Sequence, residues 1–216
     1  MIIKKLKQFL VDIGDASYYK KLESELRGMD SVLDLGCGSN SPLAKIKKHF
    51  KSVGLDSYKP SLEKSKKAKI HDDYRFGDVT KIDKFYPPKS FDAVIALDLI
   101  EHLRKSQALD LISKMEKIAR KKVILLTPQG FLKQPAWEGN PFQKHLSSWS
   151  LKELKNLGFK CWGMRGLKFI RGEFASIKYK PWIFWGLISV LSQVFVYYFP
   201  RLAFQIFAVK ELEANK

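Results

Sequence analysis

Residues 32–40 constrain the fold of this chain more than any other segment. They read Val-Leu-Asp-Leu-Gly-Cys-Gly-Ser-Asn, a short apolar run that ends in two glycines, with Asp34 two residues before the first glycine. Such a run is typical of a buried strand in a parallel sheet, and ligands of these sheets bind where the strands end. Gly36 and Gly38 would let the backbone approach a ligand closely, without the steric limits of a Cβ. The segment therefore predicts a ligand-binding loop at the carboxyl edge of a parallel sheet.

Three further segments end on a carboxylate at nearly the same interval. With their acids, they are residues 52–57 (Asp56), 74–79 (Asp78) and 91–98 (Asp98). Counted from Asp34, the acids are 22, 22 and 20 residues apart, which fits a repeat of one strand, one helix and two short loops. Apolar residues also recur at helical spacing after the first and the fourth strand. These are Leu43, Ile46 and Phe50, and then Ala108, Leu111, Ile112, Met115 and Ala119. The alternation predicts an α/β fold with helices on both faces of a parallel sheet.

The glycine loop is similar to motif I of the class I S-adenosylmethionine-dependent methyltransferases, an acidic residue, one variable residue and then Gly-x-Gly. Dinucleotide-binding loops are the alternative, with the pattern G-x-G-x-x-G/A. Here Ser41 stands at the third small position, and Asp34 stands where those folds usually carry an apolar residue. Residues 98–102, Asp-Leu-Ile-Glu-His, resemble the D-x-x-E-H signature of the type 11 and type 12 methyltransferase domains. The resemblance covers about residues 28–165.

This resemblance implies a Rossmann-like, seven-stranded sheet that is mostly parallel, with an antiparallel last strand over residues 203–209 beside the fifth strand, residues 122–128. Residues 158–164 would form the sixth strand. We expect an N-terminal helical extension over residues 1–28 and a methyltransferase domain over residues 29–211. Within the domain we expect a lid loop at 129–149 and an apolar helical insertion at 181–200. No Asn/Asp-Pro-Pro-Tyr/Phe tetrapeptide occurs, which makes adenine amino groups and glutamine side chains less favoured acceptors.

The resemblance also implies S-adenosylmethionine as the cofactor and assigns its contacts. The resemblance implies that Asp56, with Ser57 and Tyr58 beside it, binds the ribose hydroxyls. It also implies that Asp78 and the backbone amide of Val79 contact the adenine. The methionine part would be surrounded by Asp34, Gly36, Cys37, Gly38 and Ser39, with the carbonyls of Ala96 and Leu97 offered to its ammonium group. Each acid taken alone is more often a turn or a helix cap, but four in register favour the binding interpretation.

The expected lid holds Phe131, Trp137, Phe142, His145 and Trp149, and it starts at the same sheet edge as the cofactor loop. A base is needed only if the acceptor is a hydroxyl or a similar group, and a histidine suits that task. His49 and His71 are expected at the surface. We expect His145, ahead of His102, to act as the base, although both are more often structural. Asp98 and Glu101 have an alternative interpretation, a capping box at a helix start.

Residues 182–199 are 18 consecutive residues without a charge. A helix of this length spans ~27 Å, close to the ~30 Å of a bilayer core. A single crossing would nevertheless leave the last strand on the wrong side of the membrane. The remaining possibilities are a helix in the membrane interface, a lid over an apolar cavity, or a dimer contact.

The chain carries a net charge of +17 and has a pI near 9.7. The lysines cluster at positions 4, 5 and 7, at 45, 47, 48 and 51, and at 64, 66, 67 and 69. The last two groups are expected on helices that share one face of the sheet, which would attract anionic lipid or nucleic acid. A lysine-rich solvated surface is an equally good explanation.

The two cysteines, Cys37 and Cys161, offer neither a disulfide framework nor a zinc site, so we expect no metal centre and a reducing cytoplasm. The sequence thus predicts a methyltransferase for a small-molecule or lipid-like acceptor, cytoplasmic and peripherally attached to an anionic membrane. An RNA methyltransferase and a noncatalytic cofactor-binding or membrane-adaptor protein are the alternatives.

Overall fold

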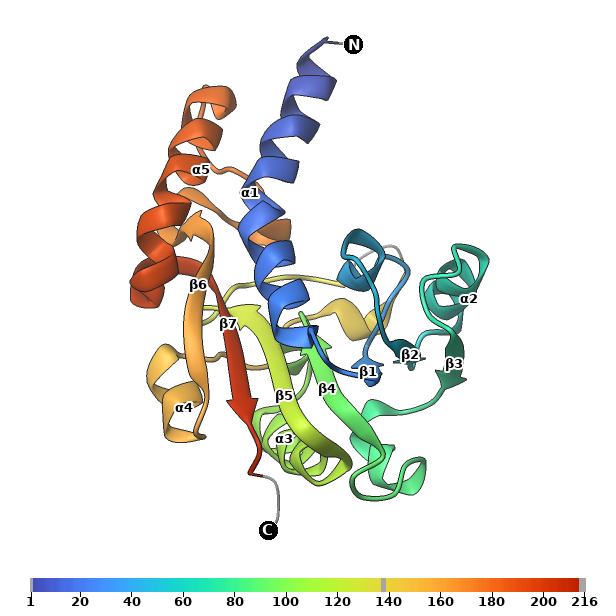
Figure 1. The fold of residues 1–216 in the computed structure, drawn as a ribbon. Helices are drawn as coiled ribbons and strands as arrows, with labels where there is room; N and C mark the ends of the chain where they lie inside the picture. The colour runs from blue at the N-terminus through green and yellow to red at the C-terminus, as the bar shows by residue number, and fades with distance from the viewer. Residues whose placement is uncertain (1, 137–138, 214–216) are drawn as a thin grey trace.

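The computed structural model describes residues 2–136 and 139–213, arranged around one seven-stranded sheet (Figure 1). Residue Trp137 of the expected lid lies outside these ranges. The strand order is β3-β2-β1-β4-β5-β7-β6. The strands are β1 (Ser31–Leu35), β2 (Lys51–Asp56), β3 (Asp73–Phe76), β4 (Phe91–Leu97), β5 (Ala119–Pro128), β6 (Lys160–Leu167) and β7 (Ala203–Glu211).

The sheet is mostly parallel, as the sequence predicts. β1 pairs in parallel with β2 and β4, β2 with β3, and β4 with β5. Only β7 runs antiparallel, and it pairs with both β5 and β6. Every residue of β4 is buried, which is expected of a central strand covered on both faces. The carboxyl ends of β1, β2, β4 and β5 therefore meet at one edge, where the glycine loop lies.

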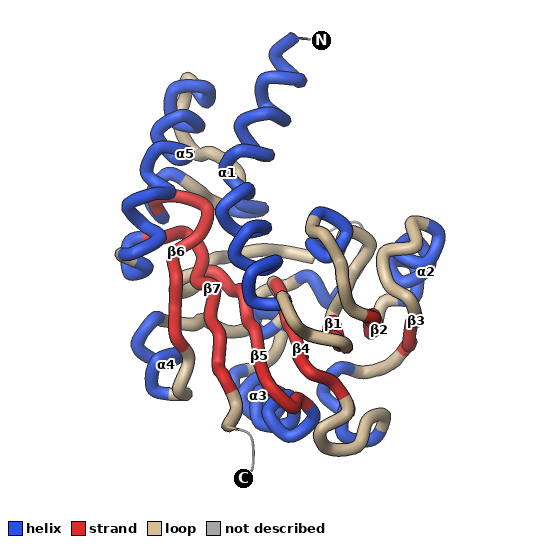
Figure 2. Tube along the Cα trace, in the orientation of Figure 1, coloured by secondary structure: helices blue, strands red, loops and turns tan. Residues whose placement is uncertain are grey.

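The helices are α1 (Ile2–Leu26), α2 (Lys59–Lys67), α3 (Lys105–Ile118), α4 (Leu151–Asn156) and α5 (Trp182–Tyr198). Figure 2 shows α1 and α3 on opposite sides of the sheet. The core is divided accordingly. Leu22 and Leu26 of α1 belong to one apolar cluster with Phe207, whereas Leu111 and Met115 of α3 belong to the other.

The prediction of a helix after β1 is wrong. The chain forms only one 3₁₀ turn there, Pro42–Lys45, and then runs without regular structure to β2. Ser41 caps this turn by accepting a hydrogen bond from the Leu43 amide at 3.2 Å, and Leu43 anchors the turn in the core. Proline favours the first position of such a turn, and the few residues left before β2 must cross back over the sheet. Lys45, Lys47, Lys48 and Lys51 consequently do not share a helical face with the lysines of α2.

Helix α5 packs on β6 with its polar side chains inward. The Gln193 amide donates to the carbonyl of Gly163 at 3.0 Å and accepts from the Gly166 amide at 2.9 Å, and the Ser192 hydroxyl accepts from the Leu167 amide at 3.2 Å. The apolar side chains on the opposite face are exposed: Phe184, Leu187, Leu191, Val194, Phe195 and Tyr198. In the part of the chain that the structure describes, no helix has the length and apolar content to cross a bilayer.

Candidate functional site

A cavity of about 570 Å³ opens at the carboxyl ends of β1, β2 and β4. Its walls come from the glycine loop, the ends of β2, β3 and β4, and the lid loop. The residues that line it include Gly36, Gly38, Asp56, Ser57, Asp78, Val79, Asp98, Leu99, His102, Asn140, Phe142 and Gln143. It therefore lies where the sequence places the cofactor, at the edge where parallel strands end.

The glycine loop forms one wall of this cavity by backbone alone. Gly36 and Gly38 have φ values of +65° and +56°, the left-handed region that favours glycine. The amides of Gly36 and Cys37 both donate to the Leu55 carbonyl, at 2.8 and 3.2 Å, which fixes the loop to β2. A Cβ on Gly38 would meet only one atom within 4 Å, the Gly36 carbonyl oxygen at 4.0 Å. The backbone at Gly38 is therefore open to a ligand.

Asp34 lies beneath this loop and does not line the cavity. Its carboxylate accepts a hydrogen bond from the Ser41 hydroxyl at 2.5 Å and lies 3.6 Å from Nε2 of His71. Burial raises the pKa of Asp34 to about 7 and lowers the pKa of His71 to about 4, so His71 is neutral at pH 7. The expectation that His71 is a surface residue is wrong. Its ring fills the space beside Gly54, where a Cβ would come within 2.6 Å of it.

Asp56 and Asp78 stand at the ends of neighbouring strands. The Asp56 carboxylate accepts hydrogen bonds from the Gly38 amide at 2.8 Å and the Tyr58 amide at 2.7 Å, and burial raises its pKa. Asp78 is more exposed. Partial burial works against its ionisation, but hydrogen bonds from Thr80 and Lys81 leave its pKa below the usual value. Each carboxylate has lone pairs left for a ligand, as hydroxyl and amino donors require.

Five other predicted cofactor contacts do not line the cavity. Cys37, Ala96 and Leu97 are buried, and Ser39 and Tyr58 are partly buried, but none of the five is among the residues that line it. The cavity instead uses residues that sequence reasoning did not assign. These are Ser61, Phe76, Gly77, Thr80, Asp98, Leu99, Leu103, Gln107, Asn140, Phe142, Gln143 and Leu146. The D-x-x-E-H signature and the aromatic content of the lid were the only local signals for them.

A second cavity, of about 340 Å³, adjoins the first and shares Asp98, His102 and Gln143 with it. Asp98 lies at the boundary with φ +55°, an uncommon conformation for a non-glycine residue. Its carboxylate accepts a hydrogen bond from the Gln205 amide and lies 3.8 Å from the Arg165 guanidinium. Burial raises the pKa of Asp98, and Arg165 opposes that shift. No local sequence pattern indicates Arg165 or Gln205, because both come from the far strands β6 and β7.

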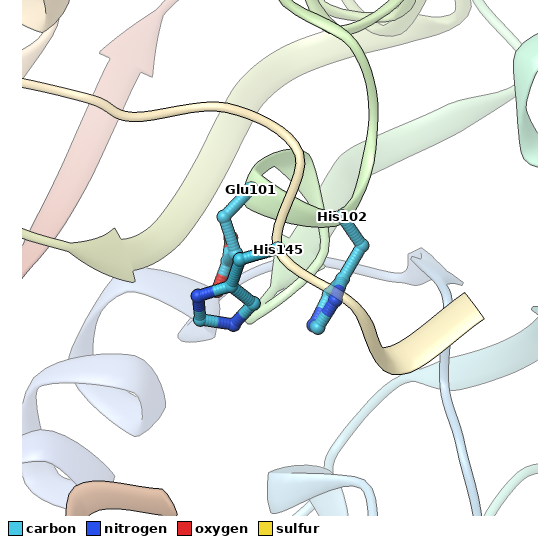
Figure 3. A group of neighbouring side chains, drawn as sticks. All are labelled: Glu101, His102 and His145. Atoms are coloured by element: carbon cyan, nitrogen blue, oxygen red, sulfur yellow. The ribbon is translucent and has the colours of Figure 1, made fainter. Parts of the chain in front are cut away.

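Glu101, His102 and His145 meet in the second cavity (Figure 3). The first two come from the short turn after β4, and His145 comes from the lid. The lid is held to this turn because the Leu146 and Ser147 amides donate to the Glu101 carbonyl at 2.8 and 3.1 Å. The capping box considered for Asp98 and Glu101 is not formed, since α3 begins at Lys105 after Arg104. Ser150 and Glu153 do form the capping box expected at α4.

Both histidines are neutral at pH 7. Burial, with a smaller contribution from His145, lowers the pKa of His102 to about 4, and burial also lowers the pKa of His145. Nδ1 of His145 lies 2.7 Å from the Leu132 carbonyl oxygen, and Nδ1 of His102 lies 3.3 Å from that of Lys144. A carbonyl only accepts, so Nδ1 carries the proton in each ring. Nε2 of each ring is therefore an acceptor.

A third cavity, of about 520 Å³, continues from the second and shares Pro128, Leu132 and Phe204 with it. Apart from Gln129, its remaining lining combines apolar and cationic side chains. The cationic ones are Lys168, Arg171, Lys178 and Arg201, and the apolar ones include Phe131, Leu167, Phe169 and Leu202. The three cavities thus follow one another from the end of β2 to the loops that flank α5.

Comparison with known proteins finds one matching family model. A family model described as a methyltransferase domain, of the type 11 group, matches residues 33–130. This range contains the glycine loop and the ends of β1 to β5. No curated protein sequence is similar enough to count as a match.

Solved structures with this fold include several methyltransferases. A SAM-dependent methyltransferase from Archaeoglobus fulgidus is 18% identical, with a TM-score of 0.56 over 95% of this chain and 99% of that one. Magnesium protoporphyrin IX methyltransferase from Synechocystis PCC 6803, with bound SAH, is 13% identical, with a TM-score of 0.52 over 95% and 87%. A putative methyltransferase in complex with the Haloferax volcanii Trm112 activator is 13% identical, with a TM-score of 0.57 over 99% and 97%.

Proposed function

We propose that this chain is a class I S-adenosylmethionine-dependent methyltransferase whose methyl acceptor is a small, lipid-like molecule with an anionic group. The observation that carries this proposal is the succession of cavities. The second cavity adjoins the cofactor cavity, and the third adds an apolar lining with four cationic side chains. An acceptor that reaches from Asp98 towards α5 would meet polar groups first, and apolar and cationic groups beyond them.

The first cavity suits the cofactor. The open backbone at Gly38 offers room for the methionine part, and the acids Asp56 and Asp78 offer acceptors for ribose hydroxyls and the adenine amino group. When bound, S-adenosylmethionine supplies an electrophilic methyl group. The protein then mainly has to align donor and acceptor, an effect that is worth ~7–11 kcal/mol in well-oriented systems. We propose that the residues around Asp98 and His102, which border both cavities, provide this alignment.

We further propose that the protein attaches to an anionic membrane surface through α5. The exposed face of α5 is apolar, and the helix turns its polar side chains towards β6, the reverse of an ordinary surface helix. Lys168, Lys178 and Arg201 line the adjacent third cavity, so cationic groups accompany the apolar face. Such a position would bring the mouth of that cavity close to lipid headgroups.

The acceptor class is tested by incubating the protein with methyl-labelled S-adenosylmethionine and fractionated lipid, RNA and protein extracts. We expect label in the lipid fraction or in small amphiphilic molecules. If the label appears only in RNA and salt weakens the retention of the protein on RNA, the acceptor is RNA and not a lipid-like molecule. The net charge of +17 is also compatible with RNA binding. Cofactor binding without transfer to any fraction would favour a noncatalytic protein.

His145→Ala should reduce turnover with the acceptor and leave cofactor affinity nearly unchanged. His145 lines the second cavity but not the first, and its Nε2 is free to accept a proton. Loss of a general base costs ~10²–10⁴-fold in rate. Steady-state kinetics and calorimetry with S-adenosylmethionine measure the two effects separately. Full activity of this variant would remove His145 from the mechanism.

Phe184→Glu combined with Leu191→Glu should release the protein from anionic vesicles. The two side chains are 54% and 75% exposed on the apolar face of α5, and each contributes about 1 kcal/mol or more on entering the interface. Vesicle binding should therefore fall by at least about 30-fold, and salt should weaken the wild-type interaction. Co-sedimentation measures both effects. Leu109→Glu, at an exposed site on α3, is the control and should bind as the wild type does. If the wild-type protein does not bind anionic vesicles at low salt, the membrane proposal is wrong.

A further inference from the structure

Three potential metal ligands converge in the second cavity. Glu101, His102 and His145 each offer one ligand atom, and these atoms all lie within 4.8 Å of one another. The side chains come from separate segments, the turn after β4 and the lid, and Figure 3 shows how they lie around the loop that carries His145. We propose that these residues form a binding site for a divalent transition-metal ion of the Zn²⁺ type, at the boundary between the cofactor and acceptor cavities.

The Glu101 side chain is the first independent support for this site. It is 2% exposed, and its Oε1 atom has no hydrogen-bond partner among the residues that the structure describes, whereas its Oε2 atom accepts a hydrogen bond from the Thr127 hydroxyl at 3.0 Å. A buried carboxylate oxygen without a partner costs free energy, so this site favours an added ligand that can pair with it. A cation at this position would provide that partner.

The histidines are oriented as metal ligands usually are. A histidine that binds a metal commonly donates its other ring N–H to a carbonyl or a carboxylate, which fixes the tautomer and the ring orientation. His145 donates from Nδ1 to Leu132, and His102 from Nδ1 to Lys144, so both Nε2 lone pairs are available. The two rings lie close, with their centroids 4.7 Å apart at an angle of 72°. The Thr127 hydroxyl orients Glu101 in the same way.

The donor set selects the type of ion. Two imidazole nitrogens and one carboxylate oxygen suit Zn²⁺ and similar ions, whereas Mg²⁺ and Ca²⁺ prefer oxygen ligands. Tetrahedral ligands at ~2.1 Å from one ion lie about 3.4 Å apart, so closure on an ion needs the three ligand atoms, which now lie within 4.8 Å of one another, to approach by up to about 1.4 Å. Three protein ligands also leave a coordination position open, as catalytic zinc sites do. That position would face the acceptor cavity.

The role of the ion in catalysis rests on the proposed function, whereas its binding does not. An acceptor hydroxyl would occupy the open position, where the ion would orient it and lower its pKa. Its proton would pass to water, and the oxygen would form a bond to the methyl group as the sulfonium S–CH3 bond breaks. The two Nε2 atoms would then bind the ion and not take a proton directly. The turnover lost in His145→Ala fits both a general base and a metal ligand, so metal binding needs a measurement of its own.

The test uses the full-length, untagged protein, freed of metal by chelation and dialysis. Calorimetry and metal analysis should find one Zn²⁺ or Co²⁺ per chain, with Mg²⁺ at least about 100-fold weaker, and bound Co²⁺ should give a visible absorption band. Glu101→Gln and His145→Ala should each weaken Zn²⁺ binding by at least about 100-fold, and Thr127→Val by ~10–100-fold. His49→Ala, at an exposed histidine outside the cluster, is the matched control and should bind as the wild type does.

Cofactor affinity serves as the check that each variant is folded, because neither Glu101 nor His145 lines the cofactor cavity. No uptake by the wild type, or equal uptake by the Glu101 and His145 variants, would overturn the metal site. If methyl transfer persists in that case, the proposed function stands. Stoichiometric Zn²⁺ uptake that both variants abolish, without transfer to any lipid or small amphiphile, would support the metal site and overturn the proposed acceptor.

Discussion

Gly36→Val should abolish measurable S-adenosylmethionine binding while the protein remains folded. Gly36 has φ +65°, and a Cβ there would lie 2.7 Å from the Leu99 side chain, which also lines the cofactor cavity. The valine would strain the loop, push Leu99 and narrow the cavity. Calorimetry with purified protein measures the affinity, and thermal unfolding measures the fold. Unchanged affinity would refute the assignment of this loop to the cofactor.

A matched control separates backbone strain from loss of the site. Gly28 has φ +74°, and a Cβ at this position would meet nothing within 4 Å. Gly28→Val therefore carries a similar backbone penalty of about 1–2 kcal/mol at the end of α1, where it does not line the cavity. We expect a similar loss of Tm and unchanged cofactor affinity. If both variants lose the cofactor equally, destabilisation and not the loop would explain the result.

Asp78→Ala tests the adenine end of the same cavity. The change removes an acceptor that lines the cavity, and also the cap that Asp78 forms with the Thr80 amide at 2.9 Å. Asp78→Asn keeps an oxygen for the cap and removes the charge. A large loss of affinity in Asp78→Ala and a smaller one in Asp78→Asn would support this carboxyl group as a cofactor contact. Full affinity in both variants would exclude it.

Gly163→Ala should cause a large loss of stability, because helix α5 lies directly on the backbone of β6. A Cβ at Gly163 would stand 2.0 Å from the Val196 carbonyl oxygen and 2.6 Å from the Ala203 Cβ. Both are backbone or buried atoms, so α5 would have to move away from the sheet. Overpacking of this kind lowers the free energy of unfolding by ~1–3 kcal/mol or more. For a chain of this size, this corresponds to a fall in Tm of several degrees.

Gly14→Ala is the matched control for this prediction. It also introduces one methyl group near α5, but its nearest neighbours, Arg171 and Val190, would lie 3.8 Å from the new Cβ. Alanine also favours a helix by ~0.5–1 kcal/mol over glycine. We therefore expect an unchanged or slightly raised Tm. Equal Tm values for the Gly163 variant and the wild type would show that α5 is not seated on β6 in solution.

The sequence alone determined the sheet, because the information for it is local. Runs of apolar residues that end at Leu35, Asp56 and Asp98 define buried strands and the edge where they stop. The glycines of the loop determine its backbone, since only they adopt its φ values without strain. The capping box of Ser150 and Glu153 likewise depends on residues three positions apart.

Helical spacing was a weaker guide. Leu43, Ile46 and Phe50 have the spacing of a helix, but proline at 42 and the Ser41 contact with Asp34 favour a single turn, and the chain then returns to β2. Spacing reports which side chains face the core, and a turn with extended chain can satisfy the same requirement. His71 was misplaced for a similar reason. Its burial depends on the missing side chain of Gly54, on a neighbouring strand.

Only the tertiary structure decided the composition of the site. Glu101 and His145 lie far apart in the sequence, and hydrogen bonds between the lid and the turn after β4 bring them together. Arg165 and Gln205 reach Asp98 only because β7 inserts between β5 and β6. Helix α5 has an apolar sequence, yet its few polar residues are the ones that face the protein, since the backbone of β6 needs their hydrogen bonds. Local patterns determine which elements form, whereas contacts between distant segments determine which side chains share a cavity.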